Sequence, residues 1–132
     1  SDTFYGVPGG LPGIETRLLA TYGLGVDTGR ITVGRLAEMA SLLPAKLYGL
    51  YPQKGVIRVG SDADLVILDP SRETVLTAAA LHEQTDYTPF EGFRVGAALE
   101  KTISRGRIIV DGDRFLGHAG DGRLLLRKLP EA

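Results

Sequence analysis

The chain has 132 residues, a formal net charge of −1, 43% hydrophobic and 23% charged residues, and no cysteine. These values are typical of one globular domain. The charge gives no electrostatic reason to expect nucleic acid or an anionic membrane as a partner, no apolar run is long enough to span a bilayer, and the lack of cysteine excludes a disulfide framework and thiolate chemistry. We expect a cytoplasmic protein.

The chain starts inside a loop rich in glycine and proline, Gly6 to Gly13, with no methionine before it. Natural domains rarely begin this way, so we expect a fragment of a longer protein. The glycines let backbone approach a neighbour or a ligand, and the loop leads into a helix, whose amides favour anions. It lacks the lysine of a phosphate-binding loop. A backbone-contact loop beside an active site and a purely structural turn both stay open.

Periodicity predicts a first helix over roughly residues 14–22. Ile14, Leu18 and Tyr22 fall on one face at helical spacing. Glu15 is predicted in the first turn, where the helix dipole favours a carboxylate, and the glycines of residues 23–25 are predicted to end the helix.

A second helix is predicted to begin near Thr32, a residue type suited to an N-cap. Its apolar residues recur at helical spacing and are Leu36, Met39, Ala40 and Leu43. Pro44 lacks an amide donor and clashes with the preceding turn, so we expect a break there and a short third helix through Leu47 to Gly49.

Residues 54–70 mark a change from helical to strand patterns. Gly55 to Val59 is a short β-type run, Gly60 to Asp62 is a turn, and Leu65 to Leu68 is an apolar run that Asp69 and Pro70 stop. A short apolar run between turn residues predicts a buried strand.

Later elements are short. Strands are expected over 73–76, 101–105 and 108–110, the last two joined at Gly106, with a turn at 111–113. Residues 77–82 fit either a helical turn or a loop, residues 86–93 form an aromatic loop, and residues 117–122 are expected to be flexible. The run Leu124 to Leu126 is an exposed apolar patch unless it docks on something.

Two groups of residues have the composition of a metal site. Asp62 and Asp64 are spaced as carboxylate ligands can be, but no third ligand is near, which favours aspartates that cap a turn. His82 and His118 are far apart, and a catalytic zinc needs three protein ligands. Glu83 and Asp86 beside His82 have only generic spacing, so we expect no metal site within this chain.

The chain also lacks an activated nucleophile, because no Gly-x-Ser-x-Gly motif occurs. We therefore expect no catalytic residue here. Tyr87, Phe90 and Phe93 either form a partner surface or, more commonly, fold their loop onto its own core.

Several motifs resemble the dihydropyrimidinase and D-hydantoinase branch of the amidohydrolase superfamily. The run from Gly60 to Ile67 resembles the ending shared by many branches, whereas the run from Asp86 to Phe93 resembles this branch in particular. The other matching segments are Pro12 to Leu18, Gly29 to Ile31, Pro44 to Pro52, Lys54-Gly55, Ile103 to Gly106 and Gly120 to Arg123.

The resemblance implies an α/β plus β fold. Residues 1–53 would supply the last loop and the terminal helices of a TIM-like (β/α) barrel. Residues 54–132 would supply the C-terminal strands of a small β-sandwich and a tail. It also implies a homo-oligomer, commonly a tetramer, to which the leucine tail would suit docking.

The implied activity of the longer protein is hydrolysis of the cyclic amide bond in hydantoins or dihydropyrimidines, cyclic ureide or imide substrates. Two zinc ions and their bridging hydroxide would act there, with ligands expected upstream of Ser1, so this chain alone is expected to be inactive. One substrate-binding position falls within it: Gly9, through its backbone, where the family usually has Asn.

Two other hypotheses stay open. The branch includes non-catalytic, cytoskeleton-associated scaffold proteins that keep the fold and lose the metals, and Gly9 in place of Asn slightly favours this alternative. The third is a stand-alone binding module, which we expect to behave poorly because Ile14, Leu18, Leu36 and Leu43 would lack the remaining barrel.

Overall fold

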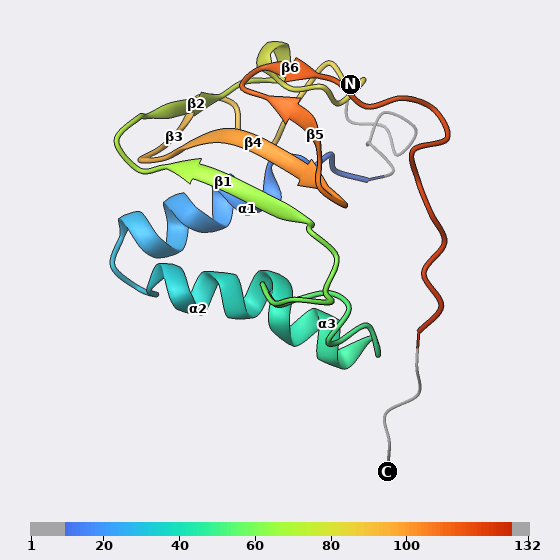
Figure 1. The fold of residues 1–132 in the computed structure, drawn as a ribbon. Helices are drawn as coiled ribbons and strands as arrows, with labels where there is room; N and C mark the ends of the chain where they lie inside the picture. Colours follow the sequence, from blue (N-terminus) through green and yellow to red (C-terminus); the bar gives the residue numbers. More distant parts are fainter. Residues whose placement is uncertain (1–9, 128–132) are drawn as a thin grey trace.

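The structure is a computed structural model that describes residues 10–127. Two helical rods come first and two antiparallel sheets follow, so the predicted order of helices and then strands is confirmed. The rods lie side by side under the strands, with α1 next to the sheets and α3 farthest from them (Figure 1).

The first rod consists of α1 (Arg17–Thr21) followed directly by the π-helical η2 (Tyr22–Asp27). The predicted end at residues 23–25 is wrong, because Gly23 lies inside the rod. A Cβ on Gly23 would lie 2.7 Å from Cε1 of Phe93. This glycine therefore permits close packing of the rod on a strand rather than ending the helix.

Two details of the first helix also differ from prediction. It begins at Arg17, so Glu15 precedes the first turn instead of lying in it, and its carboxylate accepts a hydrogen bond from the amide of His82. Tyr22 is buried as expected and Leu18 packs against the core, but Ile14 is 89% exposed.

The second rod contains α2 (Val33–Ala37), the π-helical η3 (Glu38–Leu42) and α3 (Leu43–Leu47). The predicted N-cap is confirmed, since Oγ1 of Thr32 accepts from the amide of Arg35 at 3.1 Å. Pro44 lies in the first turn of α3, as predicted, but the break before it is absent. A widened π-helical turn, in which the Leu43 amide donates to the Glu38 carbonyl, precedes the proline instead.

The larger sheet has the order β1-β4-β5-β6 and is antiparallel throughout. The smaller sheet pairs β2 with β3, and a 3₁₀ turn (η4) occupies part of the segment that the sequence left undecided. The bounds are β1 Leu65–Asp69, β2 Thr74–Leu76, η4 Ala78–Ala80, β3 Phe93–Val95, β4 Ala98–Ser104, β5 Arg107–Asp111 and β6 Arg114–Phe115.

The predicted hairpin between β4 and β5 is confirmed. Its two turn residues, Arg105 and Gly106, have φ angles of 47° and 80°, the left-handed values that two-residue hairpins need. The turn at 111–113 also forms and joins β5 to β6, with Gly112 at φ 61°.

Two strand predictions need correction. The run Gly55 to Val59 forms no strand, and Ile57 and Val59 are 85% and 99% exposed. β1 forms where expected but is not buried, since Val66 and Ile67 are 46% and 44% exposed. Among residues 10–127, β1 is an edge strand that pairs only with β4.

The core lies between the first rod, the start of the second rod and the small sheet. Val95 and Ala97 are fully buried in it, and the other buried members are Leu19, Tyr22, Leu36 and Leu76. A hydrogen bond also joins the end of the first rod to the segment after β3, because the Gly96 amide donates to the carboxylate of Asp27 at 2.7 Å. Leu36, expected to lack a partner, is 3% exposed and has one within the chain.

Candidate functional site

A loop after η4 holds the segment that enters α1. The hydroxyl of Tyr87 donates to the carbonyl of Gly10 at 2.7 Å. The amide of Glu15 donates to Oε1 of Glu83 at 3.0 Å. Both ends of residues 10–15 are therefore fixed to residues 82–87, which lie about seventy positions later in the chain. We call these contacts the N-terminal anchor.

His82 is the centre of this anchor. Its amide and its Nδ1 each lie 2.8 Å from a carboxylate oxygen of Glu15, and its Nε2 lies 3.1 Å from the Asp113 carbonyl oxygen. Both ring nitrogens face acceptors, which only the protonated imidazole satisfies. The hydrogen bond to Glu15 raises the pKa of His82 above 6.5, against partial burial and with help from the Asp113 carbonyl.

This geometry leaves His82 without a free nitrogen for a metal. Glu83 does not join it as a ligand, because its carboxylate accepts from the Glu15 amide. His118 is 77% exposed, and its ring lies 3.7 Å from Asp121. Within residues 10–127, no group of three or more His, Asp or Glu side chains is arranged to hold a metal ion.

Asp62 and Asp64 bind a lysine. The Nζ of Lys54 lies 2.8 Å from Asp62 and forms a second ion pair with Asp64. Asp62 also accepts from Gln53, and Asp64 accepts from the amide of Arg105 at 2.7 Å. The aspartates are structural, as favoured, although their partners are distant groups rather than their own backbone.

The pKa values of these carboxylates reflect the lysine clamp. The hydrogen bond from Lys54 is the main cause that lowers the pKa of Asp62. Partial burial of Asp64 opposes the same effect there, but Lys54 and the Arg105 amide together lower its pKa. The clamp joins the end of the helical part to β1 and to the β4–β5 turn.

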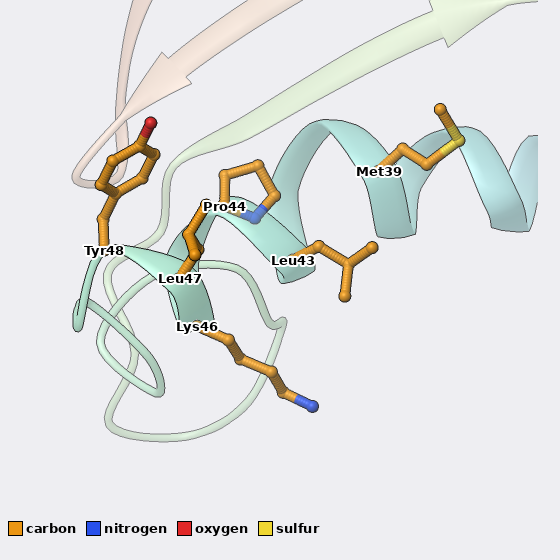
Figure 2. A pocket seen from close by; sticks show the side chains of 6 residues that line it. All are labelled: Met39, Leu43, Pro44, Lys46, Leu47 and Tyr48. Carbon is orange, nitrogen blue, oxygen red and sulfur yellow. The ribbon is translucent and has the colours of Figure 1, made fainter. Parts of the chain in front are cut away.

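The second rod presents an apolar face that nothing in residues 10–127 covers. Figure 2 shows its side chains around a shallow hollow, with Leu43 and Lys46 pointing to the same side of the helix. Leu47 and Tyr48 are 76% and 60% exposed, and Met39 is 44% exposed. Leu43, predicted to need further protein to pack on, belongs to this face.

The three aromatic residues of the loop over 86–93 have two different roles. Phe90 and Phe93 pack against the core with their ring centroids 6.1 Å apart, so they fold the loop onto its own core as the commoner alternative predicted. Tyr87 instead contacts Gly10. Gly9, the predicted substrate-binding residue, lies outside the described residues. Sequence reasoning missed the anchor because no local pattern links positions 67 to 77 residues apart.

Comparison with known proteins places the chain in a family. The sequence model of the amidohydrolase family matches residues 12–109, and the chain belongs to that family. It is 46% identical over 121 residues to a D-phenylhydantoinase of Escherichia coli O1:K1 / APEC, an alignment that covers 92% of this chain and 26% of the relative. The chain thus spans about a quarter of the length of such relatives.

Solved structures agree. The D-hydantoinase from a Bacillus sp. AR9 superposes with a TM-score of 0.91 at 41% identity, over 98% of this chain and 28% of that one. An L-hydantoinase (dihydropyrimidinase) from Arthrobacter aurescens gives 0.77 at 41% identity, over 82% and 24%. These matches confirm the resemblance drawn from the sequence. Within residues 10–127, no helix has the length and apolarity needed to cross a bilayer.

Proposed function

We propose that the protein carrying this chain is a metal-dependent hydrolase that opens the cyclic amide bond of hydantoins or dihydropyrimidines, and that this chain alone is inactive. The observation that carries the proposal is the similarity to hydantoinases, in sequence and in fold, across more than nine tenths of the chain.

In this proposal the chain contributes to two domains of the longer protein. Residues 1–53 complete a TIM-like barrel, and residues 54–132 contribute strands to a β-sandwich. Two features support the boundary: the helices end at Leu47 and the first strand begins at Leu65. The exposed apolar face around Leu43 and Leu47 supports a larger body against which the second rod packs.

The side chains that the structure describes, in residues 10–127, do not fit the two zinc ions that the family resemblance implies. His82 is engaged by acceptors on both ring nitrogens, and His118 is paired with Asp121. The zinc ligands are therefore proposed to lie elsewhere in the longer protein. The contribution of this chain to the site is the backbone at Gly9, which binds the cyclic ureide or imide.

The test uses the complete protein. Metal analysis is expected to find about two zinc ions per subunit, and hydantoin or dihydrouracil is expected to be hydrolysed. Treatment with a chelator should abolish hydrolysis and added zinc should restore it. The present chain alone serves as the control and should be inactive. A complete protein that neither holds metal nor opens either ring would favour the non-catalytic scaffold instead.

We further propose a cytoplasmic homotetramer in which the leucine tail forms contacts. Leu124 and Leu126 are 83% and 81% exposed, which supports a role in docking. The solution mass of the complete protein after deletion of Arg123 to Ala132 tests this, and an unchanged oligomer would count against it.

A further inference from the structure

We propose that His82 is a proton-operated latch for the segment over residues 112–116, which contains the β5–β6 turn and β6 and which we call the β6 arm. The protonated ring joins the β6 arm to the N-terminal anchor, and the neutral ring releases the arm while the anchor stays in place. The inference goes beyond the proposed function and does not depend on it, because each contact that it uses lies within residues 10–127.

The first argument is that the ring of His82 bridges two segments through different nitrogens. Nδ1 lies 2.8 Å from Oε1 of Glu15, before α1, and Nε2 lies 3.1 Å from the carbonyl oxygen of Asp113, in the β6 arm. The imidazolium donates to both oxygens at once, whereas the neutral ring has one N–H and one lone pair. One of the two contacts is therefore lost when the proton leaves.

The second argument decides which contact is lost. The acceptor on Glu15 is a carboxylate, and hydrogen bonds to charged groups are roughly twice as strong as neutral ones. Neutral His82 therefore keeps its proton on Nδ1, and the bare Nε2 faces the Asp113 carbonyl oxygen with a lone pair on each side. The backbone amide of His82 also donates to Glu15 at 2.8 Å, whatever the charge of the ring. The anchor therefore survives and the β6 arm loses its partner.

The third argument is that His82 holds the β6 arm from outside its own sheet. Backbone hydrogen bonds to β5 and to Glu100 fix the arm within the sheet. Among the described residues, His82 supplies the side-chain hydrogen bond that the arm receives from another segment. The ring of Phe115 is 61% exposed, and its centroid lies 6.2 Å from that of His82, within the range of aromatic pairs. Release of Asp113 therefore leaves the arm with its sheet contacts and one aromatic contact.

The charges around the ring favour its protonated form. The carboxylates that act on it belong to Glu15 and to Asp113, while Glu83, next to His82 in the loop, accepts from the Glu15 amide. The hydrogen bond to Glu15 is the main cause that raises the pKa of His82 above 6.5; partial burial opposes it and the Asp113 carbonyl supports it. In the folded protein the latch is therefore closed below pH 6.5 and opens as the pH rises through the raised value.

The experiment measures hydrogen–deuterium exchange of the complete protein at about pH 6 and about pH 9, on either side of histidine titration, with rates corrected for the intrinsic pH dependence of amide exchange. A peptide over residues 112–116 reports the arm, because the amides of Gly112 and Leu116 are hydrogen-bonded to the sheet. A peptide over residues 15–20 reports the anchor. His82→Asn keeps a donor near the position of Nδ1 and removes Nε2, so it imitates the open latch. His118→Asn changes the second of the two histidines in this chain, whose side chain is 77% exposed, and is the matched control.

In the unmutated protein, we expect exchange in the β6 arm to be about tenfold faster at the higher pH and exchange in residues 15–20 to change by less than about twofold. His82→Asn should exchange fast in the arm at both pH values, and His118→Asn should behave like the unmutated protein.

Three results would overturn the inference. The first is equal protection of the β6 arm at both pH values, and the second is an equal loss of protection in the arm and in residues 15–20. The third is a pH response that persists in His82→Asn or disappears in His118→Asn. The unmutated protein decides the first two by itself, so the latch stays falsifiable even where His82→Asn does not fold.

Discussion

Replacing Gly23 with alanine tests why a glycine lies inside the first helical rod. The added methyl would lie 2.7 Å and 3.1 Å from Cε1 and Cζ of Phe93 and 3.4 Å from a methyl of Val95. Val95 is fully buried and cannot move aside without disturbing the core. The Phe93 ring must therefore shift.

The expected magnitude follows from two opposing effects. Overpacking of a well-packed site costs roughly 1–3 kcal/mol, and the better helix propensity of alanine offsets up to about 1 kcal/mol. A net loss of about 1 kcal/mol in unfolding free energy is expected. Gly34→Ala is the matched control, because its nearest neighbour would be Oγ1 of Thr32 at 3.8 Å, an ordinary contact. That change should gain about 0.5 kcal/mol.

Urea unfolding of the complete protein, with midpoint and slope compared, measures both effects. Adding Phe93→Leu to Gly23→Ala should restore part of the loss, so that the double variant is more stable than the sum of the single changes predicts. A Gly23→Ala protein as stable as Gly34→Ala would refute the close-packing explanation.

Three further substitutions have expected outcomes. Thr32→Ala removes an N-cap and should lose about 1 kcal/mol in urea unfolding, while Thr32→Ser should keep it; equal losses would contradict the cap. Glu15 raises the folded-state pKa of His82 above 6.5, so this contribution to stability is complete below pH 6.5 and is lost as the pH rises through the folded-state value. Thermal unfolding of His82→Asn across that range should depend less on pH, and an unchanged dependence would argue against the ion pair. Gly106→Ala imposes φ 80° on an L-residue and should cost about 1 kcal/mol, whereas Gly122→Ala, in open space, should be close to neutral; similar effects at both sites would speak against backbone strain.

Features with local causes were predicted well from the sequence. Thr32 caps its helix through an amide three residues away, and Gly106 forms a two-residue turn between strands. The apolar run from Leu65 likewise becomes β1. Each depends on a few adjacent residues, so the sequence pattern contains the necessary information.

Features with distant causes were predicted wrongly or not at all. A glycine pair after a helical pattern usually ends a helix, but Gly23 instead accommodates Phe93, seventy positions later. The β-type run around Ile57 has the right composition but pairs with no strand. Pro44 predicted a break in the second rod, but the rod continues through the proline. The π-helical turn before Pro44 widens the helix and takes the place of the break.

The candidate site shows the same limit. The sequence drew attention to Asp62 and Asp64 as paired carboxylates, and the structure assigns them to Lys54. Contacts between Gly10 and Tyr87 or between Glu15 and His82 leave no periodic trace, because each joins single residues across most of the chain. The motifs in the sequence identified the family, and only the structure identified the anchor.

The tie between Asp27 and Gly96 spans 69 residues, and this has a consequence for synthesis on the ribosome. The first rod leaves the exit tunnel well before the strand that covers it. At roughly 5–20 residues per second, the delay is about 3 to 14 s. During that interval the part of the rod that packs on Phe93 and Val95 lacks these two partners and is open to chaperones. Slower translation between the rod and β3 would lengthen this exposure, and a lower yield of folded protein is the expected result.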